Sequence, residues 1–108
     1  MSAKILFWIF TSIGAILEIA GDVFFKKWAV ENRPLLMWSG FIIYSIGALF
    51  WAYSLKYEML SKAISIFTIL NLVIVAIVGI IFFKENISMM ARLGIVLGII
   101  SIVLIERG

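Results

Sequence analysis

The sequence contains no cysteine and no histidine, and only 14% of its 108 residues are charged. Without thiol groups it can form no disulfide and no thiolate nucleophile, and it lacks the usual ligands of a zinc site. Without histidine, no Ser-His-Asp arrangement can be built. No other pairing of a nucleophile with a base is evident, so we expect a protein that is not an enzyme and binds no metal or cofactor.

Basic residues are also few, and they form no patch. The formal net charge is +3, but the lysines and arginines are spread over every loop, which argues against a nucleic-acid partner. Apolar residues make up 65% of the chain, whereas soluble domains contain about 45–50%. This composition excludes an ordinary soluble domain and predicts that the chain is surrounded by membrane lipid.

Four long apolar runs account for most of the chain. A helix needs roughly 20 apolar residues to cross a hydrocarbon core about 30 Å thick. The runs predict transmembrane helices over residues 5–25, 35–55, 63–83 and 89–105. Short connections force neighbouring helices to run antiparallel. We therefore expect an all-α membrane protein with a single transmembrane domain over residues 1–108.

The orientation in the membrane depends on the basic residues, because the side with more Lys and Arg stays cytoplasmic. The two sides hold four and five of these residues: Lys4, Lys56, Lys62 and Arg107 on one, and Lys26, Lys27, Arg33, Lys84 and Arg92 on the other. This near tie predicts insertion in both orientations, with opposite copies paired as an antiparallel, dual-topology homodimer. The alternative is that one strong charge, such as Lys4, fixes a single orientation.

Glu18 is the most informative residue, because it lies in the middle of the first apolar run. An acid at a helix centre costs at least about 2.5–3.5 kcal/mol to insert and usually faces a partner, a cavity or a pathway. Removal from water favours the neutral form of a carboxyl group, which brings proton exchange towards working pH. Such a group can hold either a proton or a cation. The alternative is an acid that only holds helices together.

Two further polar residues share the helical face of Glu18. Asp22 follows one turn later, at the four-residue spacing that places two side chains on one face. It is either an accessory site or the partner of Lys26 in a local ion pair. Thr11 lies two turns before Glu18, with Gly14 beside this stripe. A stripe of small and polar side chains suits a substrate pathway.

The second and third predicted helices offer more candidates. Gly40, Tyr44, Gly47 and Trp51 share one helical face, where the glycines either admit another backbone or leave room for substrate. Tyr44 adds a hydroxyl and a ring whose face attracts organic cations. In the third helix Phe67 lies beside the polar positions. Asn71 is costly when unpaired, so we expect it to form a hydrogen bond across helices.

The fourth helix presents Gly94, Gly98 and Ser101 at spacings of four and three. This pattern of small residues is typical of close helix packing in membranes. We expect a dimer contact here, because four helices can scarcely surround a substrate cavity and eight can.

These residues resemble the small multidrug resistance family of proton-coupled exporters, in the drug/metabolite transporter superfamily. The likeness covers nearly the whole chain. Ala-Ile-Leu-Glu-Ile-Ala-Gly, with Lys26 after it, is similar to the family's first-helix signature, in which Glu18 would bind substrate and protons alternately. Tyr44 matches a family tyrosine. Ser-Leu-Lys-Tyr at 54–57, Phe-Phe-Lys-Glu at 82–85, and Gly94 with Ser101 resemble its other helix boundaries and its dimer motif. The resemblance implies antiparallel dimers of four-helix subunits.

The sequence departs from that family around the third helix. Phe67 stands where the family has tryptophan, Ile64 replaces a tyrosine, and the usual proline and glycines appear as Met59, Ile69 and Asn71. Asp22 is unusual too. The carboxylate is retained but its surroundings differ, so a polyamine, another metabolite or a lipid headgroup stays open as substrate besides quaternary ammonium or guanidinium compounds.

We therefore expect a proton-coupled antiporter that exports small cationic or amphipathic organic compounds by alternating access. Its location would be the inner membrane of a prokaryotic cell, crossed several times. Two alternatives stay open: a subunit that flips a lipid headgroup, and a non-transporting assembly or scaffold protein in which Glu18 forms only a fixed bond.

Overall fold

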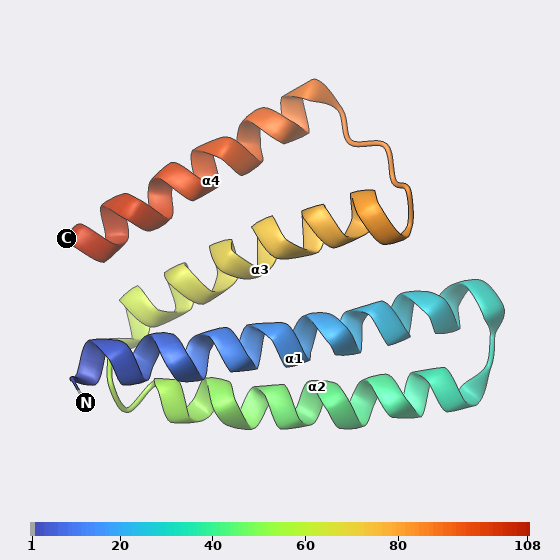
Figure 1. Ribbon diagram of the computed structural model, residues 1–108, viewed down its shortest axis with the longest axis horizontal. Helices are drawn as coiled ribbons and strands as arrows, with labels where there is room; N and C mark the ends of the chain where they lie inside the picture. The colour runs from blue at the N-terminus through green and yellow to red at the C-terminus, as the bar shows by residue number, and fades with distance from the viewer. Residues whose placement is uncertain (1) are drawn as a thin grey trace. The chain divides into compact units, whose positions relative to one another are not determined.

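The computed structural model describes residues 2–108. Within that range the chain forms four helices, all long and apolar enough to cross a membrane (Figure 1). They are α1 (Ala3–Glu31), α2 (Pro34–Ser54), α3 (Leu60–Phe82) and α4 (Met89–Arg107). The predicted all-helical membrane architecture is thus confirmed. The antiparallel dimer stays a prediction.

Helix α1 is longer than the predicted span of residues 5–25. It begins after Ser2, whose side chain accepts a hydrogen bond from the Ile5 N–H, and ends at Asn32, which has a φ of 57°. A helix of 29 residues measures about 43 Å at 1.5 Å per residue, more than the hydrocarbon core. The last turns, which contain Lys26, therefore lie beyond the apolar part of the helix. Charges end the apolar run without ending the helix.

Only Asn32 and Arg33 separate α1 from α2, so these two helices form a tight antiparallel hairpin (Figure 1). Pro34 occupies the first turn of α2, where its missing N–H costs nothing. At the other end the Ser54 hydroxyl donates to the Trp51 carbonyl oxygen over 2.6 Å. The predicted start of the second helix at residue 35 differs from the observed one by a single position.

Helices α3 and α4 form a second hairpin, and the chain divides into two units after Met59. Ser88 caps α4, because its hydroxyl accepts a hydrogen bond from the Ala91 N–H over 3.1 Å. Helix α4 buries none of its residues. Helix α3 buries Ala63, Ile66 and Gly79. The single transmembrane domain over residues 1–108 stays a prediction.

Candidate functional site

Helices α1 and α2 touch through four glycines, which we call the glycine seam: Gly14 and Gly21 in α1, and Gly40 and Gly47 in α2. A Cβ placed on Gly21 would lie 2.9 Å from the Gly40 carbonyl oxygen, and one on Gly14 would lie 3.1 Å from that of Gly47. Only glycine permits so close an approach of two backbones. The seam therefore brings the two helices into direct backbone contact at two levels.

Glu18 lies at the seam, between Gly14 and Gly21. Its side chain is 8% exposed, and a Cβ on Gly47 would be 2.9 Å from both its Cγ and its backbone nitrogen. The base of the Glu18 side chain thus packs directly against the backbone of α2. Of the two roles considered for Gly47, backbone approach is the one that the structure shows.

Tyr44 and Asp22 are the ionisable neighbours of Glu18. The Tyr44 hydroxyl lies close to the Glu18 carboxyl group, to which it can donate a hydrogen bond, and the Asp22 carboxylate interacts with it electrostatically. Tyr44 is 37% exposed, and Asp22 is exposed as well. Within residues 2–108 no ion pair joins Asp22 to Lys26. The polar face predicted for α1 and the tyrosine predicted from α2 are therefore brought together.

Two buried side-chain atoms in the described part of the chain have no hydrogen-bond partner: Glu18 Oε2 and Thr11 Oγ1. Thr11 is completely buried. A buried polar group without a partner costs about 1–3 kcal/mol, and more when it is charged. An ionised Glu18 can satisfy its free oxygen by accepting a hydrogen bond from a cation, and a protonated one can donate. The arrangement is thus suited to exchange one positively charged ligand for another.

Phe67 and Asn71 lie in α3, in the second unit. The Asn71 Nδ2 donates to the Phe67 carbonyl oxygen over 2.8 Å. The Asn71 amide thus forms a hydrogen bond one turn back along its own helix, and the hydrogen bond predicted across helices stays a prediction. The substrate-binding role of both residues stays a prediction.

The three small residues of α4 have different surroundings. A Cβ on Gly94 would meet nothing within 4 Å, whereas one on Gly98 would lie 3.3 Å from Ile69 Cγ2 of α3. The Ser101 hydroxyl donates to the Leu97 carbonyl oxygen of its own helix. Gly94 therefore faces open space, and Gly98 faces α3 of the same chain. The dimer contact predicted at these positions stays a prediction.

An aromatic cluster at the Phe10 end of the α1–α2 hairpin went unnoticed in the sequence. The Phe10 ring centre lies 6.2 Å from that of Phe50, 6.0 Å from Tyr53 and 5.9 Å from Tyr57. The Lys56 Nζ sits 5.1 Å from the centre of the Tyr53 ring. The Tyr53 ring therefore forms a cation–π interaction with a lysine of the same chain. Tyr53 and Tyr57 have the positions of interface anchors, and only the antiparallel register joins them to Phe10.

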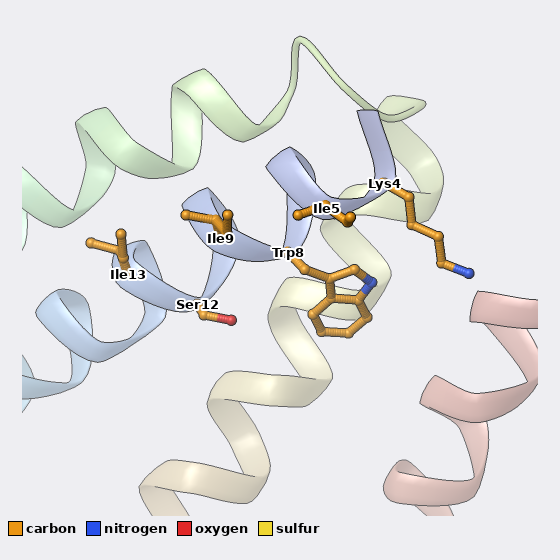
Figure 2. A pocket seen from close by; sticks show the side chains of 6 residues that line it. All are labelled: Lys4, Ile5, Trp8, Ile9, Ser12 and Ile13. Atoms are coloured by element: carbon orange, nitrogen blue, oxygen red, sulfur yellow. The ribbon is translucent and has the colours of Figure 1, made fainter. Parts of the chain in front are cut away.

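A second feature is an open hollow of about 590 Å³ on the first half of α1. Figure 2 shows its six lining side chains, all from one stretch of this helix: Lys4, Ile5, Trp8, Ile9, Ser12 and Ile13. Its wall is almost wholly apolar, apart from the Lys4 ammonium and the Ser12 hydroxyl. Such a surface suits contact with lipid chains.

The profile of the EamA-like transporter family matches residues 2–107. The chain belongs to this family. An uncharacterized membrane protein of Bacillus subtilis (strain 168), YvaE, is 26% identical over 103 residues, which cover 93% of this chain and 87% of that protein. No solved structure matches the chain.

Membership in the EamA-like transporter family agrees with the predicted drug/metabolite transporter superfamily. It favours a membrane transporter over an enzyme, as the missing nucleophile and base suggested. Four spanning helices in a transporter family also indicate a multi-pass membrane protein. The narrower resemblance to small multidrug resistance proteins stays a prediction, as does the inner membrane.

Proposed function

We propose that this EamA-like protein is an antiporter that exports small cationic or amphipathic organic compounds in exchange for protons. The observation that carries the proposal is the buried Glu18 carboxyl group, of which one oxygen has no hydrogen-bond partner among residues 2–108. A buried acid that is held by no fixed cation can bind a mobile one. Either a proton or an organic cation satisfies it, and the two exclude each other.

Because the two ligands exclude each other at Glu18, proton movement would be coupled to movement of the organic cation. Occupation of Glu18 by one ligand discharges the other, and rocking between two related packings exposes the site to each side in turn. In the proposed antiparallel homodimer two copies of Glu18 face one cavity, so the pair titrates as coupled groups. Tyr44 orients the carboxyl group, and Thr11 supplies a second unpartnered oxygen on the same face. Asp22, Phe67 and Asn71 complete the proposed lining.

The environment of Glu18 favours transport over a scaffold. A scaffold protein needs a permanent basic or amide partner for a buried acid. In residues 2–108 Glu18 is paired with neither, and the side chain placed to donate to it is that of Tyr44, a 37% exposed residue. A hydroxyl donor leaves the negative charge of the carboxylate uncompensated, which is the state that an exchanged cation requires.

Transport in proteoliposomes tests the proposal. Purified protein is reconstituted, a pH gradient is imposed, and uptake of a small amine, a polyamine and a lipophilic quaternary cation is followed. We expect the wild type to move at least one of them against its gradient and Glu18→Gln to move none. Glu31→Gln is the matched control, because Glu31 is the exposed last residue of the same helix. Equal transport by Glu18→Gln and wild type would refute the exchange role.

A further inference from the structure

Gly47 packs tightly against Glu18. Its absent Cβ would lie 2.9 Å from the Glu18 Cγ, 2.9 Å from the Glu18 nitrogen and 3.0 Å from the Gly14 carbonyl oxygen. Carbon atoms in contact prefer separations of about 3.5–4.0 Å. A methyl group at position 47 therefore has no space unless something moves.

A change of the Glu18 side chain alone cannot provide that space. Two of the three atoms are backbone atoms of α1, and they belong to the hydrogen-bonded helix. The contact is also reciprocal, because a Cβ on Gly14 would lie 3.1 Å from the Gly47 carbonyl oxygen. A side chain at 47 must therefore separate the two helices at this level. Tyr44, one turn before Gly47 on the same face, would then move away from Glu18.

We propose that Gly47 is a positioning residue for the Glu18 carboxyl group. By carrying no side chain, it lets the α2 backbone close on the base of the Glu18 side chain and holds the carboxyl group at the Tyr44 hydroxyl. The importance of this contact for transport rests on the proposed function. The contact itself concerns only the α1–α2 hairpin. Tyr44 of α2 and Asp22 of α1 are the titratable groups that interact with Glu18.

Gly40 offers a matched control for simple packing. Its absent Cβ would lie 2.9 Å from the Gly21 carbonyl oxygen, 3.0 Å from Phe24 Cβ and 3.0 Å from Phe25 Cδ1. Gly40 is in the same helix, two turns from Gly47, and is equally crowded by α1. None of these contacts is with Glu18. Alanine at either position should destabilise the hairpin similarly, but alanine at 47, which presses on Glu18 itself, should disturb the carboxyl group more.

The titration of Glu18 distinguishes a positioning role of Gly47 from simple packing between the helices. Protein carrying ¹³C in its glutamate carboxyl groups is titrated in detergent, and the Glu18 signal is assigned by its loss in Glu18→Gln. We expect Gly47→Ala to change the titration midpoint by about one pH unit, the worth of one hydrogen bond to a charged group. Gly40→Ala should change the midpoint by less than Gly47→Ala does. An unchanged midpoint in Gly47→Ala, or the same change in both variants, would overturn the proposal.

This measurement needs no substrate, so it stays informative if the chain exchanges no cation. A failure of the proposed function would appear as absent transport by wild-type protein. A failure of the present inference would appear as an unchanged Glu18 signal.

A second measurement uses wild-type protein and does not depend on the folding of Gly47→Ala. In bilayer samples labelled with ¹³C at glycine Cα and glutamate Cγ, a strong dipolar correlation should join Gly47 to Glu18. Glu18→Gln, whose Cγ carries no label, is the control that assigns this signal. Absence of the correlation in wild-type protein would overturn the proposal whatever the stability of the variant.

Discussion

The glycine seam makes a quantitative prediction for Gly21→Ala. The new Cβ would lie 2.9 Å from the Gly40 carbonyl oxygen, 2.9 Å from Tyr44 Cβ and 3.1 Å from the Tyr44 nitrogen. These contacts involve backbone atoms and the first carbon of a side chain, so no rotamer change relieves them. Gly94→Ala is the comparison, because a Cβ there would meet nothing within 4 Å.

The expected difference in the free energy of unfolding comes from the contributions that differ between Gly21→Ala and Gly94→Ala. Alanine has a higher helix propensity than glycine by about 1 kcal/mol, but this gain is common to both variants and cancels in the comparison. Burial of the new methyl group contributes little, because lipid is as apolar as the seam. Overpacking costs typically about 1–3 kcal/mol. The free energy of unfolding of Gly21→Ala should therefore be about 1–3 kcal/mol lower than that of Gly94→Ala.

Reversible unfolding in mixed micelles with rising dodecyl sulfate, followed by circular dichroism, measures this difference. The protein is diluted until its unfolding no longer depends on its concentration, so that association of Gly94 surfaces does not contribute. If Gly21→Ala were as stable as Gly94→Ala or more so, the backbone contact between α1 and α2 would not be as the structure has it.

Three further predictions concern the aromatic cluster, the dimer and the orientation. Phe10→Leu removes three ring contacts worth about 0.5–1.5 kcal/mol each and should lower the free energy of unfolding by about 1.5–4.5 kcal/mol. Phe82→Leu, at a 71% exposed position, should change it by less than about 0.5 kcal/mol, and equal effects of the two changes would contradict the cluster. Gly94→Leu should not lower the free energy of unfolding of the chain but should weaken its association in sedimentation experiments, and unchanged association would place the dimer contact elsewhere. A reporter fused after residue 108 should appear on both sides of the membrane in comparable amounts, and a single orientation would contradict dual topology.

The helices could be predicted from the sequence, but some of their ends could not. Apolar runs reveal where a helix crosses hydrocarbon, because few charges are tolerated there. They say less about where it stops, since a helix continues through Lys26 and Lys27 once it is in water. Helix α1 therefore ends six residues after the predicted position. Pro34 marked the start of α2 well, because proline acts directly on the backbone.

The candidate site was partly predictable as well. Spacing placed Thr11, Glu18 and Asp22 on one face of a helix, and it placed Tyr44 with the glycines of α2. The contact between the two faces depends on the register of the hairpin, which the two-residue turn sets and periodicity does not. Asn71 shows another limit, because an amide can bond its own helix one turn back. Composition cannot distinguish that bond from one across helices.

Release of protons on binding of a cation tests the central claim most directly. A lipophilic quaternary cation, a polyamine and a small amine are each added to detergent-solubilised protein in weakly buffered solution, and the protons released are counted. We predict release from wild-type protein and from Glu31→Gln, and none from Glu18→Gln. Binding of a cation to wild-type protein without release, or undiminished release from Glu18→Gln, would contradict exchange at Glu18.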